Sequence, residues 1–144
     1  MLGFGESALS IYLNDHLAGA TAGVQLARRL APGELAEEIE EDRESLLDVM
    51  RRLSVGCDHV RAVLGWGGEK ALRLKPGGRF EELEALSLGV EGKLALWTAL
   101  RRATGDDPRV RSVDFDALIA RARSQRRRLE ERRLRAASDA LGDR

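Results

Sequence analysis

The fold is decided by residues 35–53, LAEEIEEDRESLLDVMRRL. Steps of four and three residues along this stretch pick out apolar side chains at Leu35, Ile39, Leu46, Val49 and Leu53. This spacing is typical of a helix that turns one apolar stripe toward the core of a bundle. Asp42 falls on the same stripe, where the rhythm otherwise demands an apolar residue. The stretch therefore predicts an amphipathic helix with one carboxylate directed inward.

Helix-breaking residues divide the rest of the chain. They lie at Pro32-Gly33, Gly56, Pro76 to Gly78, and Gly105 to Pro108. The predicted helical segments run from Ser7 to Leu30, Leu35 to Leu53, Asp58 to Leu74, Phe80 to Ala103, and Asp114 to Leu141. The third segment is predicted to be short or broken, because its interior glycines disfavour a helix.

The other three long segments carry the same rhythm. The first has Leu9, Leu13, His16, Ala20, Gly23, Ala27 and Leu30; the fourth has Leu83, Leu86, Val90, Leu94 and Trp97; the fifth has Phe115, Leu118, Ala122, Gln125, Leu129, Arg132 and Ala136. Small residues from Ala18 to Gly23 would let the first helix approach a neighbour closely. Short connections favour antiparallel neighbours. We expect an all-α, up-down-up-down four-helix bundle with one extra short helix between the second and third long helices.

Composition agrees with one helical domain spanning residues 1–144. Hydrophobic residues make up 43% of the chain and aromatic residues 4%, with Leu and Ala carrying most of the apolar share. No stretch is long and apolar enough to cross a membrane, and a single cysteine, Cys57, is compatible with a reducing compartment. We expect a cytoplasmic protein that does not enter membranes.

Charge is balanced overall but segregated along the chain. The 24 basic and 24 acidic residues cancel. Residues 34–48 hold eight acidic side chains against one Arg, whereas residues 121–135 hold eight Arg against two Glu. The two segments are interpreted as complementary faces that pack together or are solvated, and nucleic-acid binding is disfavoured.

Polar residues on the apolar stripes are the candidate site. A buried carboxylate needs a cation or hydrogen-bond donors, and the stripe residues able to partner Asp42 are His16, Gln125 and Arg132. We expect these four residues to form a polar network in the core.

A metal centre is the alternative use of the same positions. Imidazole and carboxylate side chains that face each other inside a bundle can bind iron, manganese or zinc. The candidate ligands are His16, Asp42, Glu38 and Glu91. Against this reading, the residues three before His16 and His59 are Leu13 and Gly56, so the Glu-x-x-His motifs of dinuclear centres are absent.

A third reading comes from the end of the second segment. Residues 50–64, MRRLSVGCDHVRAVL, are similar to the helix-turn-helix core of bacterial transcription regulators, with Arg61 placed to contact DNA. The preceding helix is strongly acidic, and Asp58 lies near the start of the would-be recognition helix. Both features oppose binding to phosphates, so this function is the least favoured of the three.

Two further stretches carry a family resemblance. Residues 13–23, LNDHLAGATAG, together with residues 89–97, GVEGKLALW, resemble an uncharacterised bacterial family of short helical proteins. The overall plan also resembles the ferritin-like four-helix bundle. That resemblance implies the bundle architecture and, in iron-binding members, an internal centre of carboxylates and histidine.

The expected function is an interaction or structural role without catalysis. The polar stripe residues would specify how the helices pair. Leu88, Leu96 and Trp66 lie off the stripes and could line a surface for a protein partner or a second copy of the chain.

Overall fold

The computed structural model describes residues 7–58 and 78–142, and these residues form helices without any strand. The long helices are α1 (Ala8–Leu30), α2 (Glu34–Arg52), α5 (Arg79–Thr104) and α6 (Phe115–Leu141), and η2 (Pro108–Val110) is one short 3-10 turn. The all-α prediction with four long helices is confirmed. The extra helix predicted from Asp58 to Leu74 lies outside the described residues, apart from Asp58 itself. None of the described helices is long and apolar enough to span a membrane.

Helix ends follow local chemistry. The Ser7 side chain accepts a hydrogen bond from the Ser10 amide at 3.1 Å and caps α1, and Asp114 caps α6 by accepting one from the Ala117 amide at 2.9 Å. Between α1 and α2 the chain reverses at Gly33, whose φ of 107° is strained for any residue with a side chain. These signals explain why the predicted ends of the long helices agree with the observed ones to within a residue or two.

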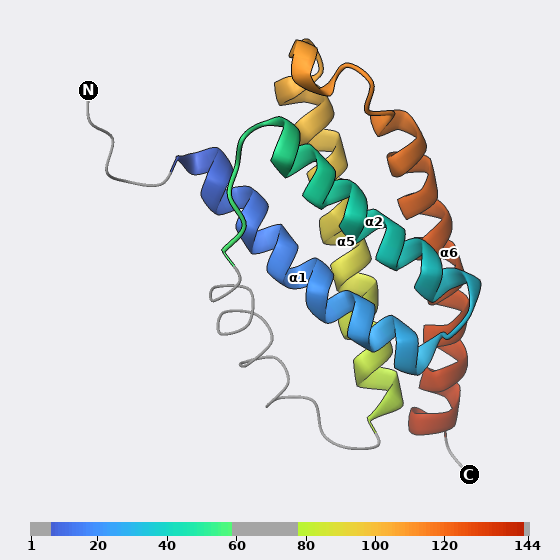
Figure 1. Cartoon of the computed structure of the whole chain (residues 1–144). Helices are drawn as coiled ribbons and strands as arrows, with labels where there is room; N and C mark the ends of the chain where they lie inside the picture. The colour runs from blue at the N-terminus through green and yellow to red at the C-terminus, as the bar shows by residue number, and fades with distance from the viewer. Residues whose placement is uncertain (1–6, 59–77, 143–144) are drawn as a thin grey trace.

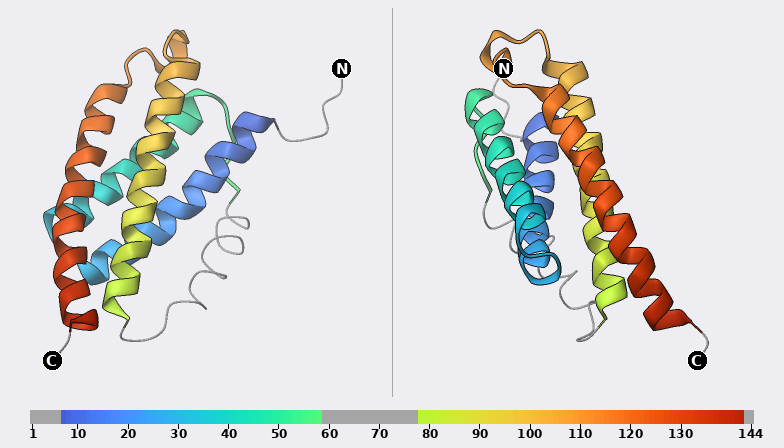
Figure 2. Two further views of the ribbon diagram at one scale, coloured as in Figure 1. Left: turned by 180° about the vertical axis from the view of Figure 1, so that it is seen from behind. Right: turned by 90° about the vertical axis from the view of Figure 1, so that its right-hand side faces the viewer.

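The helices form two layers, with α1 and α2 in one and α5 and α6 in the other (Figures 1 and 2). The closest helix packing joins α5 to α6, α1 to α2, and α1 to α5. This arrangement is compatible with a four-helix bundle. It places α2 and α6 on the same side of the bundle, where long side chains bridge them.

The direction of α5 differs from the strict alternation that we expected. Arg79, at the start of α5, donates a hydrogen bond to the carbonyl of Leu30 at the end of α1, at 3.3 Å. Arg109, beyond the end of α5, donates to the carbonyl of Leu53, just beyond the end of α2, at 3.4 Å. Thus α2 and α5 run in the same direction, and an up-down-up-down order is wrong at this step. The reason is that the connection from α2 to α5 joins opposite ends of the bundle, whereas we expected mostly short connections between antiparallel neighbours.

Most predicted stripes are buried, but the stripe of α1 is rotated. All six stripe residues of α2 are buried, including Asp42. On α1, Leu17 and Val24 are buried although they were not assigned to the stripe, whereas His16, Ala20 and Gly23 are only half-buried. All three residues line a cleft, and Ala20 also packs against the apolar core.

The apolar core has two parts, separated by a polar layer. One part contains Leu46, Trp97 and Leu118, and the other contains Ile39, Val90 and Leu129. Asp42 lies between the two parts along α2, Lys93 lies between them along α5, and Gln125 lies between them along α6. The polar layer therefore crosses the bundle at one level.

The segment that follows α2 is anchored by a buried amide. Asn14 of α1 is 1% exposed; its side-chain nitrogen donates to the carbonyls of Ser10 at 3.0 Å and Gly56 at 2.9 Å. Its oxygen accepts a hydrogen bond from the Asp58 amide at 2.7 Å. The amide is thereby satisfied on both sides, which fixes where the chain leaves α2.

Candidate functional site

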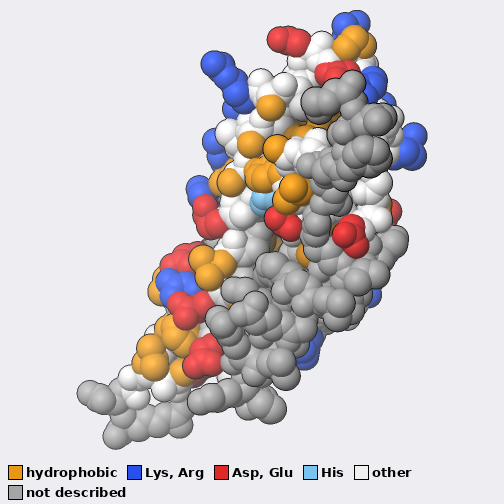
Figure 3. Space-filling view, turned by 90° about the vertical axis from the view of Figure 1, so that its left-hand side faces the viewer, with side chains coloured by type: hydrophobic (Ala, Val, Ile, Leu, Met, Phe, Trp, Pro, Cys, Tyr) orange, Lys and Arg blue, Asp and Glu red, His pale blue; other side chains and the backbone are white. Residues whose placement is uncertain are grey.

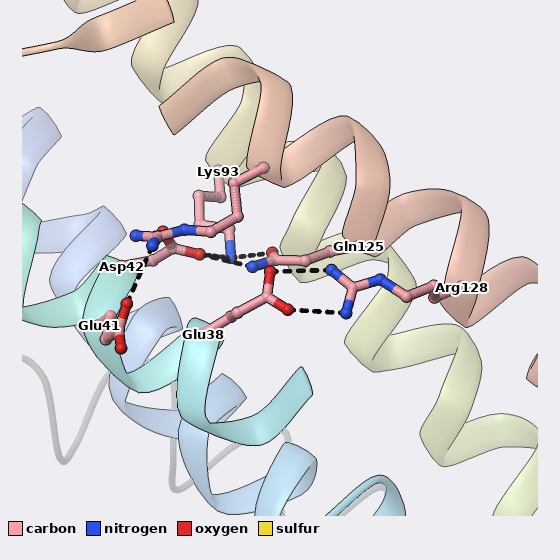
Figure 4. Close-up of polar contacts among 7 residues, drawn as sticks. Glu38, Glu41, Asp42, Lys93, Gln125 and Arg128 are labelled. Atoms are coloured by element: carbon pink, nitrogen blue, oxygen red, sulfur yellow. Dashed lines mark hydrogen bonds and ion pairs between the residues drawn. The ribbon is translucent and has the colours of Figure 1, made fainter. Parts of the chain in front are cut away.

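Asp42 lies at the centre of the polar layer (Figure 4). Its side chain is 1% exposed, and one carboxylate oxygen accepts hydrogen bonds from Lys93 Nζ at 2.6 Å and Gln125 Nε2 at 2.8 Å. The other oxygen accepts two from Arg121, at 2.8 Å from Nε and 2.5 Å from Nη2. Helix α2 supplies the acid, α5 the lysine, and α6 the glutamine and arginine. One buried carboxylate thus joins three helices.

Lys93 and Gln125 complete the inner part of the network. Lys93 Nζ donates to Gln125 Oε1 at 2.5 Å, so the buried glutamine amide uses both its donor and its acceptor. Burial lowers the pKa of the Lys93 ammonium, and the charge of Asp42 opposes that shift. The lysine is therefore held as the counter-ion of a carboxylate in an otherwise apolar interior.

An outer part of the network lies between α2 and α6. Arg128 donates to both carboxylate oxygens of Glu38, at 2.7 and 2.8 Å, and these hydrogen bonds lower the pKa of Glu38. Arg121 also donates to Glu41 at 3.0 Å. We call the seven residues the Asp42 network: Glu38, Glu41, Asp42, Lys93, Arg121, Gln125 and Arg128. Within it, Arg121 and Arg128 of the basic segment pair with Glu38, Glu41 and Asp42 of the acidic segment, as expected for complementary faces.

Two of the four residues predicted for the core network belong to it. Asp42 and Gln125 meet as expected, whereas His16 makes no hydrogen bond to Asp42. Arg132 lies about two turns beyond Gln125 on α6, in a surface hollow that also contains Leu35. Because α6 moves away from the level of Asp42 over these turns, Arg132 cannot reach it.

Lys93, a main partner of Asp42, was not among the partners predicted from the sequence. Strict alternation of three and four residues along α5, from Val90 to Trp97, selects Lys93, whereas we placed Leu94 on the stripe. Leu94 is only partly buried. The signal was present in the spacing, but a lysine is not normally assigned to a core position. Arg121 was missed for a different reason: it flanks the stripe residue Ala122 and reaches Asp42 with its long side chain.

A cleft of about 400 Å³ lies between α1, α2 and α5, and we call it the α1–α2–α5 cleft. Figure 3 shows hydrophobic side chains gathered on one face of the molecule, with acidic side chains at their edge. Most residues that line the cleft are apolar, and its glycines come from the interiors of two helices: Gly19, Gly23, Gly89 and Gly92. Asp42 and Lys93 also line it. The Asp42 network therefore forms part of the cleft wall.

His16 lines the same cleft from α1. Its imidazole packs edge-on against Tyr12, with 4.7 Å between ring centroids. Burial lowers the pKa of His16 from its ordinary value of 6.5, and the nearby Asp15 carboxylate partly opposes this shift. The imidazole is accordingly neutral at pH 7, with one donor and one acceptor.

The four candidate metal ligands do not form a cluster. Glu38 is held by Arg128, and Glu91 pairs with Arg126 at 2.9 Å on an exposed surface. Asp42 is neutralised by Lys93 and Arg121. Over residues 7–58 and 78–142, no three His, Cys, Asp or Glu side chains are grouped as metal binding requires. The helix-turn-helix reading depends on Arg61, which lies outside these ranges.

We predict strong energetic coupling between Asp42 and Lys93. Lys93→Met alone should reduce the free energy of unfolding by about 3 kcal/mol, because it leaves a buried carboxylate short of a counter-ion. Asp42→Leu alone should cost a similar amount, and the double variant should lose much less than the sum of the two. Urea unfolding of the four proteins measures this coupling. The exposed pair Glu91 and Arg126, truncated to alanine, is the control and should couple by less than about 1 kcal/mol; additive losses at Asp42 and Lys93 would contradict the network.

We predict that His16 makes stability depend on pH below neutrality. Because the folded pKa is lower than the unfolded one, the unfolded chain binds a proton first as the pH falls through 6.5. Stability contributed by neutral His16 is complete above that pH and is lost below it. Between about pH 7.5 and 5.5, the wild type should therefore lose more unfolding free energy than His16→Gln. His59 is common to both proteins and cancels in the comparison; parallel pH profiles would show that burial of His16 has no such effect.

Comparisons with known protein families, with curated proteins and with solved structures gave no match for this chain. The resemblances to ferritin-like bundles and to a bacterial helical family thus stay predictions.

Proposed function

We propose that the protein is a non-enzymatic helical-bundle protein that acts by binding, with the α1–α2–α5 cleft as its binding site. The Asp42 network has a structural role in this proposal: it holds α2, α5 and α6 at a fixed register and forms one wall of the cleft. The expected interaction role is thereby assigned to a particular surface.

The observation that carries the proposal is the open space at three of the four cleft glycines. A Cβ built on Gly23 or Gly89 meets no atom of the described residues within 4 Å, and one built on Gly92 meets only His16, at 4.0 Å. Glycine inside a helix costs up to about 1 kcal/mol relative to alanine. Close helix packing, which the small residues from Ala18 to Gly23 led us to expect, does not offset that cost at Gly23. The glycines instead keep the cleft wide.

The chemistry of the cleft wall supports binding over catalysis. The hydrogen bonds of Asp42 and Lys93 are made to each other, to Arg121 and to Gln125. Their protons and lone pairs are thus committed to the fold. His16 lies on the α1 side with the Asp15 carboxylate nearby, but the described residues that line the cleft include no serine, threonine or cysteine for this imidazole to activate as a nucleophile.

Several finer expectations belong to this proposal. A bundle with one long crossover connection is the arrangement of ferritin-like folds, which supports a ferritin-like topology here. We retain the extra short helix between α2 and α5, a cytoplasmic location and self-association or a protein partner as parts of the proposal. Binding of iron, manganese or zinc stays the alternative function. DNA binding is less favoured, because several α6 arginines already pair with acidic side chains.

Filling the cleft should abolish binding of an apolar probe without unfolding the protein. The probe is N-phenyl-1-naphthylamine, an uncharged dye that fluoresces when it leaves water. Gly23→Leu and Gly89→Leu, each made separately, should bind it at least about tenfold more weakly than the wild type. Leucine favours the helix more than glycine does, so both variants should remain folded.

Ala95→Leu is the matched control, because Ala95 lies on an exposed part of α5 and does not line the cleft. It should bind the dye as the wild type does. Circular dichroism and thermal unfolding verify that each variant is folded. Equal binding by all four proteins, or no binding by the wild type, would contradict the proposed site.

A further inference from the structure

Trp97 lines the α1–α2–α5 cleft and carries a buried hydrogen-bond donor without a partner. The residue is fully buried at 0% exposure, and it lines the cleft from α5. Its indole nitrogen has no hydrogen-bond partner, which makes it one of two such buried side-chain atoms among the described residues. The indole N–H can only donate. Buried donors are nearly always paired, so this indole is an exception that needs an explanation.

The indole is held in place. Phe115 of α6 packs against it with 6.4 Å between ring centroids, and both rings belong to the larger apolar part of the core. The donor therefore cannot turn toward solvent without disturbing that packing. A cleft of about 400 Å³ is in the usual size range for a small organic ligand, and its mostly apolar lining fits such an occupant.

The charges that line the cleft argue against a charged ligand. They are two acids and two bases: Asp15, Asp42, Arg43 and Lys93. Lys93 is committed to Asp42 and Gln125. Arg43 donates to the Thr21 hydroxyl at 3.0 Å and pairs with Glu44 at 3.5 Å. An anion would therefore find both cations among the described lining residues engaged, and a cation would find only the exposed Asp15 carboxylate outside the Asp42 network.

We infer that the cleft takes a small, uncharged, largely apolar molecule that carries a hydrogen-bond acceptor, such as a carbonyl oxygen, for the Trp97 indole. This inference rests on the proposed function and specifies its ligand class. The apolar body of the ligand occupies the space left by the helical glycines, and its oxygen accepts the hydrogen bond from Nε1. A hydrocarbon of the same shape leaves the donor unmet, and a carboxylate of the same shape has to leave water without a counter-ion.

Three naphthalene derivatives of nearly equal size separate the effect of a hydrogen-bond acceptor from the effect of a charge. They are 2-acetylnaphthalene with a ketone acceptor, 2-ethylnaphthalene with none, and 2-naphthoate with a charge. Each is titrated into the full ¹⁵N-labelled chain carrying Trp66→Phe, so that the remaining indole resonance belongs to Trp97. The ketone should bind about fivefold more tightly than the hydrocarbon and shift the indole proton downfield, as a new hydrogen bond does. The carboxylate should bind more weakly than either.

Trp97→Phe should bind the ketone and the hydrocarbon with equal affinity. If that variant does not fold, the indole shift in the Trp66→Phe chain still decides the question. Equal affinity for ketone and hydrocarbon in the parent, an indole resonance that the ketone leaves in place, or tightest binding of the carboxylate would each overturn the inference. In those cases the proposed function stands if Gly89→Leu weakens binding, and it fails with the inference if no apolar compound binds.

Discussion

The burial of one carboxylate, that of Asp42, constrains the rest of the bundle. A carboxylate removed from water costs several kcal/mol unless cations and donors surround it. The structure meets this requirement with Lys93 from α5 and with Arg121 and Gln125 from α6. Apolar packing alone allows neighbouring helices to slide and rotate against each other. The hydrogen bonds and ion pairs of Asp42 can form only when α2, α5 and α6 are at one relative position. The Asp42 network therefore determines how the two helix layers align.

The same layer connects the fold to the proposed binding site. Lys93 faces the core through its ammonium group and also lines the cleft, so the cleft wall is only as rigid as the network. Along α5, Gly89 and Gly92 leave space open on the cleft side. Trp97 on the same helix packs against the ring of Phe115. In our proposal this wall favours recognition by shape and by one hydrogen bond over chemistry, because Asp42 and Lys93 in it already pair with each other.

Much of the fold could be predicted from residue spacing, but among the partners of Asp42 only Gln125 could. The stripe of α2 and the inward position of Asp42 follow directly from the period of its apolar residues. Lys93 was missed because its spacing competes with that of Leu94, and hydrophobicity alone favours the leucine. The stripe of α1 was misplaced at Ala20 and Gly23 because an open cleft and a packed core select the same small residues, and His16 was assigned to that stripe by spacing alone. The direction of α5 depends on the end of the bundle at which the long connection from α2 finishes. The spacing of apolar residues within a helix carries no information about that.

The protonation and order of the Lys93 side chain show whether a buried pair of Asp42 and Lys93 constrains this fold. The chain has three lysines, so ¹H–¹⁵N spectra of their ammonium groups are simple, and Lys93→Met identifies the relevant signal. If the pair is buried, we expect a distinct Lys93 ammonium signal at neutral pH and room temperature that exchanges slowly with water. This signal should disappear in Asp42→Leu. A Lys93 signal that exchanges with water as fast as that of a solvated lysine, or that is unchanged in Asp42→Leu, would contradict a buried Asp42–Lys93 pair as the constraint on this fold.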